Sequence, residues 1–421
     1  MTKPPARRRL LAALAVAAAA FVLRAGYLLH AAPPAPLAGD AAEYRAYADS
    51  LVTRGVFEGF RGDRATRMPG YPVFLAALDL AAGPSTRVVQ WAQCLLGALT
   101  CACIYLWALA LLRPRWALAC GLAAAGYYDL IAPSSWVLTE TLYSFLLAAS
   151  LCILYLDQLP PRRRALLGGL GLGLTYLVRP EVLPFATLIL AAGPFVLRGF
   201  TRRGAVLALA AFAAAVSLWV GRNALVFRRF IPVSTIGKYS LYLGLRLPLD
   251  HQSLDLGPRH VAPTAMSELE RETDYQRAYE VLRPRVPWPN RLKAYAFSLL
   301  TVYYPFLPIY DWTYALLVPF WLFGLWLARD RRELWPPAAI VCGLSAVFAV
   351  LAGPVSRYRF GFSPCLLVLA GAGAQEFYDR TPGSRRFLWG TAAWTAANLA
   401  AWAASAGLRE TALLLKDFIW R

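Results

Sequence analysis

The sequence is poor in the residues that build metal centres and disulfide frameworks. Histidine occurs three times in 421 residues, and none of the seven cysteines forms a C-x-x-C pair. All seven cysteines fall in apolar segments, where cysteine usually packs as a small hydrophobe. These absences argue against a zinc site, a disulfide framework and a metal role for His251 and His260.

Lysine and acidic residues are also scarce, so arginine carries almost all of the net charge of +19. A charge of this size is compatible with nucleic acid binding. The arginines, however, are spread over short loops between apolar runs and do not gather in one basic domain. We therefore expect anionic membrane lipids, and not nucleic acid, to be their partners.

Long polar stretches are few, since 58% of the residues are hydrophobic. Such a chain is too apolar for an ordinary soluble domain. Apolar runs of about 20 residues, each long enough to cross about 30 Å of hydrocarbon, recur along it. The sequence predicts an all-α polytopic membrane protein, a bundle of about eleven transmembrane helices. The runs lie at 10–31, 88–112, 116–132, 136–156, 165–178, 182–197, 204–221, 312–328, 335–352, 360–376 and 387–406.

The distribution of arginine predicts the orientation of the chain. Placing Arg7, Arg8 and Arg9 inside the cell also puts the other arginine-rich short loops inside, in agreement with the positive-inside rule. Two long segments, about 32–87 and 222–311, then lie outside. We expect three regions: 1–221 as a transmembrane module that includes the first outer loop, 222–311 as an extracytoplasmic loop region, and 312–421 as C-terminal transmembrane helices.

The second outer segment contains two helical patterns. Residues 267–282 carry charge on most faces and predict a solvated surface helix. Residues 291–304 are amphipathic and are typical of a helix that lies on the membrane. We find no internal repeat, which argues against a transporter, because many transporters are built from repeats.

Carboxylates and arginines gather at the outer ends of the predicted spans, where ionisable groups are usually functional. They come from five places that are distant in the sequence. Arginine binds two phosphate oxygens with its planar fork, and a carboxylate can accept the proton of an attacking hydroxyl. The pattern therefore predicts an outward cavity with arginines for a phosphate and a carboxylate for a base. Such a set is sufficient for glycosyl transfer from a lipid-linked phosphate, whose growing charge the arginines would stabilise. The residues are Asp40, Glu43, Arg67, Glu140, Arg179, Glu181, Arg222, Asn223, Arg357, Tyr358 and Arg359.

Each cluster also has a structural interpretation. Asp40 and Glu43 have the spacing of a helix capping box. Arg179 and Glu181 can form a structural ion pair, and other arginines of the set can extend to the membrane interface. Only the proximity of these side chains distinguishes a catalytic site from separate structural contacts.

The sequence resembles the bacterial integral-membrane glycosyltransferases of the GT-C fold, the group that includes protein O-mannosyltransferases and the aminoarabinose transferase of lipid A. The resemblance is carried, in family order, by "GDAAEY" at 39–44, "RMPGYPVFLAAL" at 67–78, "TETLYSFLL" at 139–147, "LWVGRNALVFRRFIPVST" at 218–235 and "RYRFGFSP" at 357–364. It spans most of the chain.

The resemblance implies a GT-C module of about seven N-terminal spans, with the larger outer loop after the seventh. It also implies a polyprenyl-phosphate-linked sugar donor, a lipid, glycan or protein acceptor, and inverting transfer on the outer side of the bacterial cytoplasmic membrane, with the N-terminus cytoplasmic. Asp40 would be the general base, Glu140 the second acidic residue and Arg67 the ligand of the donor phosphate. Weaker candidates for the phosphate are Arg179, Arg222, Arg357 and Arg359. Substrate-binding candidates are Glu43, Tyr44, Tyr71, Glu181, Asn223 and Tyr358.

The sequence departs from the family at the first motif. Many relatives carry adjacent Asp and Glu, whereas Ala41 follows Asp40 here. We therefore expect a metal-independent reaction without a cofactor. A flippase or transporter of lipid-linked sugars is the alternative function, and a structural membrane protein without chemistry is a third.

Overall fold

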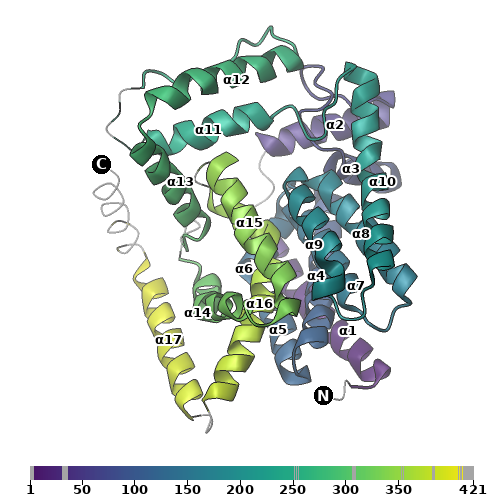
Figure 1. The fold of residues 1–421 in the computed structure, drawn as a ribbon, viewed down its shortest axis with the longest axis vertical. Coiled ribbons are helices and arrows are strands. Elements are labelled where there is room, and N and C mark those ends of the chain that lie inside the picture. Colours follow the sequence, from purple (N-terminus) through teal and green to yellow (C-terminus); the bar gives the residue numbers. More distant parts are fainter. Residues whose placement is uncertain are drawn as a thin grey trace.

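The protein was analysed as a computed structural model. The structure describes residues 4–30, 37–250, 252, 254, 256–305, 310–351, 353, 355–381, 385–405, 407 and 410. His251 lies outside the described residues. The described chain is built from α-helices with four short 3₁₀ turns and contains no β-sheet, as the apolar periodicity predicts (Figure 1).

Each predicted apolar run coincides with a helix, but the helices differ in length. Four segments of the described chain are long and apolar enough to cross a membrane: α1, α4, α10 and Arg332–Leu351. The others are shorter or more polar, so about eleven spans stays a prediction. The helices of the runs are α1 (Ala6–His30), α4 (Thr86–Leu111), α5 (Pro114–Gly126), α7 (Glu140–Tyr155), α8 (Pro161–Val178), α9 (Leu183–Val196), α10 (Arg202–Phe227), α14 (Trp312–Leu327), α15 (Trp335–Leu351), α16 (Arg359–Arg380) and α17 (Arg385–Ala403).

The run at 116–132 is interrupted. Helix α5 ends at Gly126, and its continuation is the short helix α6 (Tyr128–Ile131) followed by a 3₁₀ turn over Ala132–Ser135. The break lies at Tyr127, whose backbone is extended, with φ −79° and ψ 121°.

The segments between the runs also contain helices. The first outer loop folds into α2 (Asp40–Arg54) and α3 (Gly70–Ala82), and the second into α11 (Gly237–Leu249), α12 (Glu268–Arg285) and α13 (Trp288–Val302). The helix predicted at 267–282 is confirmed as α12, in which only Leu282 is buried. Helices α11, α12 and α13 share a small apolar core of their own around Tyr242, Leu245 and Val286.

Helices α11 and α12 lie at one end of the bundle, and the N-terminus lies at the other (Figure 1). Side chains of the arginine-rich turns contact one another in pairs. Arg113 binds Asp379, and Arg164 donates to the carbonyl of Arg198 at 3.0 Å. Turns that the charge pattern assigned to the same side are thus neighbours in space.

Glycine permits the closest helix contacts. A Cβ atom at Gly169 on α8 would lie 2.1 Å from the carbonyl oxygen of Ala208 on α10, and one at Gly324 on α14 would lie 1.9 Å from that of Leu369 on α16. Small residues that let backbones approach are typical of helix pairs in membranes.

We expect Gly169→Ala to destabilise the protein by about 1–3 kcal/mol, because its methyl group must push two helix backbones apart. Gly221→Ala on α10 is the matched control, since a Cβ atom there meets nothing within 4 Å. Thermal unfolding in detergent checks both variants. Equal unfolding midpoints for the two variants would show that α8 and α10 accommodate the methyl group without loss of stability.

Candidate active site

Helix α2 brings two carboxylates to Arg67. Asp40 and Glu43 lie in its first turn, and Gly39 is the N-cap residue, with a φ of 56° that favours glycine. No side chain caps this helix; instead Asp40 Oδ1 and Glu43 Oε2 each accept a hydrogen bond of 2.7 Å from Arg67. The capping-box interpretation is therefore wrong for Asp40.

A second arginine reaches Asp40 from the opposite end of the sequence. Arg357 lies in the 3₁₀ turn before α16 and binds Asp40 Oδ2, so each oxygen of this carboxylate has its own guanidinium. Arg357 Nε also lies 4.0 Å from Glu140 Oε1. Residues 317 positions apart thus meet at one point.

Glu140 is the first residue of α7 and lies between two arginines. Its side chain is 4% exposed, and Oε1 is 3.8 Å from Arg179 Nη1. Arg179 ends α8 and also lies 3.7 Å from Glu181 Oε1. Glu140 Oε2 is buried without a hydrogen-bond partner in the described structure, so this carboxylate has free accepting capacity.

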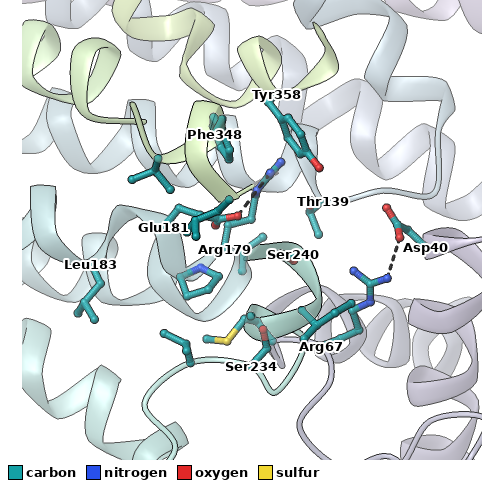
Figure 2. Close-up of a pocket in the computed structure, with 18 of the residues that line it drawn as sticks. Asp40, Arg67, Thr139, Arg179, Glu181, Leu183, Ser234, Ser240, Phe348 and Tyr358 are labelled. Carbon is teal, nitrogen blue, oxygen red and sulfur yellow. Dashed lines mark hydrogen bonds and ion pairs between the residues drawn. The ribbon is translucent and has the colours of Figure 1, made fainter. Parts of the chain in front are cut away.

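Apart from Glu43, which lines only a second cavity, these groups line one cavity of about 380 Å³, here called the arginine cavity. Figure 2 shows Arg67 and Arg179 on opposite sides of it, with Phe348 and Tyr358 beside Arg179. The ring centroids of these two residues are 5.6 and 5.7 Å from the Arg179 guanidinium carbon. Further residues of the lining are Asp40, Tyr44, Thr66, Met68, Leu138, Thr139, Glu140, Val178, Pro180, Glu181, Leu183, Pro184, Val233, Ser234, Ile236, Gly237, Ser240, Val347, Leu351 and Arg357.

Asp40 and Arg67 also line a second cavity of about 470 Å³, here called the outer cavity. Its walls are the first outer loop, parts of the segments 235–239 and 261–264, and one face of α12, on which Glu268, Arg271, Glu272 and Tyr275 recur at helical spacing. The Asp40–Arg67 pair therefore stands between two cavities of different character. The arginine cavity has an apolar wall, and the outer cavity is rich in carboxylates and tyrosines.

The surroundings of Asp40 fix its charge. Burial raises its pKa, but the guanidinium groups of Arg67 and Arg357 outweigh this effect and hold the pKa below the ordinary value. Burial raises the pKa of the neighbouring Tyr44 to about 12. At neutral pH, Asp40 is thus a carboxylate and Tyr44 a neutral phenol.

Arg359 does not belong to this site, which corrects its assignment to the donor phosphate. Its side chain is fully buried, with Nε and Nη2 at 2.7 and 3.0 Å from the two oxygens of Asp129 and Nη2 at 3.2 Å from Asp311. The ring of Tyr314 lies 3.6 Å from its guanidinium carbon. Two carboxylates and an aromatic face already occupy this arginine.

Arg222 and Asn223 also lie outside the arginine cavity. Arg222 Nη1 donates to the carbonyl of Arg64 at 2.7 Å, and Asn223 Nδ2 donates to that of Ile231 at 3.1 Å. The donor-phosphate assignment of Arg222 and the substrate assignment of Asn223 are therefore replaced by structural roles. These two side chains hold the outer loops.

Tyr71 is likewise buried outside the cavity. Its hydroxyl donates to Gln93 at 2.9 Å, and its ring packs edge-on against Tyr44 with centroids 5.2 Å apart. It supports a cavity residue and has no exposed surface with which to bind substrate.

Sequence reasoning missed several polar groups of the two cavities. Ser234 and Thr235 lie within the quoted "PVST" motif, yet neither was assigned a role. Thr66 precedes Arg67 and lines both cavities. A signal existed for these three, since they adjoin recognised motifs. Glu268, by contrast, lies in a helix whose charge pattern only indicated solvation.

Comparison with solved structures identifies the class of this fold. Neither a protein-family model nor a curated protein matches the sequence. The helical arrangement is nevertheless that of GT-C membrane glycosyltransferases, so the resemblance predicted from the sequence is confirmed for the fold.

The similar structures include two complexes of archaeal oligosaccharyltransferases and one bacterial protein. The oligosaccharyltransferase AglB of Archaeoglobus fulgidus, with an inhibitory peptide and a dolichol-phosphate, aligns at TM-score 0.54 and 13% identity over 88% of this chain and 50% of its own. An oligosaccharyltransferase of the same organism, in complex with zinc and sulfate, aligns at TM-score 0.52 and 14% identity, over 93% of this chain and 51% of its own. ArnT of Cupriavidus metallidurans aligns at TM-score 0.41 and 16% identity, over 86% of this chain and 77% of its own. The chain spans about half the length of the oligosaccharyltransferases it matches.

Proposed function

We propose that this membrane protein is a glycosyltransferase that moves a sugar from a polyprenyl-phosphate-linked donor to an acceptor hydroxyl. The observation that carries the proposal is the position of Asp40, which lies between two arginines where two cavities meet. A shared fold with an oligosaccharyltransferase solved with a dolichol-phosphate supports it. The proposed acceptor is a lipid, a glycan or a protein.

The arginine cavity suits a lipid phosphate. Arg67, Arg179 and Arg357 surround it with guanidinium groups, which bind phosphate oxygens in pairs. Leu183, Pro184, Phe348 and Leu351 form an apolar wall along which the first isoprene units would lie. Glu140, which also lines this cavity, would be the second acidic residue near the sugar.

The reaction needs one base and one stabilised leaving group. The acceptor oxygen attacks the anomeric carbon, its proton passes to Asp40, and the bond from that carbon to the phosphate oxygen breaks. The electron pair leaves with the polyprenyl phosphate, whose growing charge the arginines stabilise. A single displacement of this kind inverts the anomeric centre.

Donor binding would also activate the base. In the free protein, both oxygens of Asp40 are occupied by Arg67 and Arg357. A donor phosphate competes for these two guanidinium groups and so weakens their hold on Asp40, which then faces the acceptor in the outer cavity. Because Ala41 follows Asp40 where many relatives carry an adjacent Glu, we propose a metal-independent reaction.

The proposed location follows from the charge pattern. With the arginine-rich turns in the cytoplasm, both cavities open on the outer side of the cytoplasmic membrane. The polyprenyl donor would therefore be used on the side where cell-envelope acceptors are assembled.

A transfer assay tests the function. Purified protein receives a panel of radiolabelled polyprenyl-phosphate sugars together with membrane extract, with and without a chelator. We expect label to leave the lipid for one donor class, and the chelator to have no effect. Donor that binds but is never consumed, and that crosses vesicle membranes, would instead favour the flippase.

The charge state of Asp40 predicts the pH profile. A base with a depressed pKa stays deprotonated as the pH falls, so kcat/KM should decline only below the ordinary titration range of an aspartate. Arg357→Gln removes one of the two cations, raises the pKa of Asp40 and should move this acid limb to higher pH. Both proteins are assayed with the same donor, so the titration of the donor phosphate affects both pH profiles equally. A difference between the profiles then belongs to the protein. Superimposable acid limbs would contradict the role of Asp40 as base.

A further inference from the structure

Glu268, the first residue of α12, binds the segment that leads to Arg67. Its Oε2 accepts a hydrogen bond of 2.7 Å from the backbone N–H of Arg64. Its Oε1 accepts bonds of 2.9 Å from the N–H of Ala65 and 3.1 Å from the hydroxyl of Thr66. One carboxylate thus holds three consecutive residues more than 200 positions earlier in the chain.

Other contacts reinforce this junction. The hydroxyl of Thr235 also donates to Glu268, and its N–H donates to the carbonyl of Ala65 at 3.0 Å. One turn further along α12, Arg271 forms an ion pair with Asp63. The outer helix and the first outer loop are therefore joined by hydrogen bonds to charged groups, which are stronger than neutral ones.

The opposite side of the same segment is held by α10. Arg222 Nη1 donates to the carbonyl of Arg64, and Arg222 Nη2 donates to that of Phe57 at 3.3 Å. Residues 63–66 are therefore held from two sides. This rigid segment leads directly to Arg67, whose side chain reaches Asp40 and Glu43.

We propose that Glu268 is the positioning residue of Arg67 and thereby sets the donor affinity of the site; this inference rests on the proposed function. Glu268 lines the outer cavity and is absent from the lining of the arginine cavity. It therefore acts on the donor phosphate through the backbone that precedes Arg67. When the hydrogen bonds of Glu268 are lost, the guanidinium of Arg67 remains but is no longer held in one orientation. Phosphate binding is then weakened more than the rate of the chemical step is lowered.

Glu268→Gln is the primary test. The amide NH₂ cannot accept a hydrogen bond, so at least one of the backbone bonds is lost. We expect the KM for the polyprenyl-phosphate sugar to rise about tenfold, as for the loss of one charged hydrogen bond, with a much smaller change in kcat. Glu280→Gln, on the same helix and bonded only to Gln276 among the described hydrogen bonds, should match wild type.

Hydrogen exchange provides a readout that does not depend on activity. The amides of Arg64 and Ala65 donate directly to Glu268, so they should exchange faster in Glu268→Gln and normally in Glu280→Gln. Unchanged exchange together with unchanged KM overturns the proposal. Faster exchange in a protein that transfers no sugar upholds the clamp and rejects the proposed function.

A milder variant covers the case in which Glu268→Gln fails to fold. Thr235→Val removes one hydroxyl bond to Glu268 and keeps the backbone N–H that bonds Ala65. It should change donor KM and amide exchange in the same direction by a smaller factor. Wild-type values of both in this variant, with Glu268→Gln unfolded, would also overturn the proposal.

Discussion

Asp40→Asn is expected to lower turnover by about 10²–10⁴-fold, the contribution of a general base. The amide has nearly the shape of the carboxylate but cannot take the proton of the acceptor hydroxyl. Donor binding should persist or become tighter, because removal of this charge frees Arg67 and Arg357 for the phosphate. Single-turnover transfer and equilibrium binding of polyprenyl phosphate separate the two effects.

Asp49→Asn is the matched control for this prediction. Asp49 lies on the same helix, is 55% exposed and pairs loosely with Arg45 at 3.8 Å. The control should transfer sugar at the wild-type rate. If purified Asp40→Asn did the same, Asp40 would be a structural partner of the two arginines and the base would have to be sought elsewhere.

Arg359→Leu is expected to cost about 3–5 kcal/mol of stability, because it leaves Asp129 and Asp311 buried without their cation. Tyr127 and Ser363 bond Asp129 but carry no compensating charge. The cluster joins α16 to α6 and to the start of α14, so its loss should loosen the bundle. Thermal unfolding in detergent, followed by tryptophan fluorescence, measures the effect.

The control for this variant lies on the same helix. Arg380→Leu removes an arginine that is 54% exposed and paired with Glu376 four residues earlier, and such surface pairs contribute about 1 kcal/mol or less. Arg359→Lys should fall between the two, since it keeps the charge and loses the fork that holds both oxygens of Asp129. A melting curve of Arg359→Leu that overlays that of Arg380→Leu would contradict the structural role.

The charged residues of the arginine cavity could be predicted because they belong to motifs with a chemical rationale. Glu140, Arg179 and Arg357 carry charge near the ends of apolar runs, where ionisable groups are usually functional, and Arg67 begins a recognised motif of the first outer loop. The sequence could not tell Arg357 from Arg359, although they point to different places. Residues two apart do not share a helix face, and which face meets the cavity depends on the packing of α16.

The fold was predictable for a similar reason, and its details were not. Apolar periodicity located the helices of all the runs. It did not identify α3, an apolar helix of the first outer loop that packs beside α8. Glu268 was beyond prediction, because its bonds depend on α12 meeting a segment about 200 residues away. The local sequence of α12 marks Glu270, which forms a capping box with Ser267, but nothing in it marks Glu268.

The separate small core of α11–α13 has a consequence for how such proteins diversify. The proposed donor cavity is framed largely by other helices, while α12 contributes a whole wall of the outer cavity. Substitutions on that wall away from Glu268 and Arg271 would leave the proposed donor cavity unchanged. Selection for a new acceptor would then change mainly helices α11–α13. The hydrogen bonds between Glu268 and the loop before Arg67 would have to be kept.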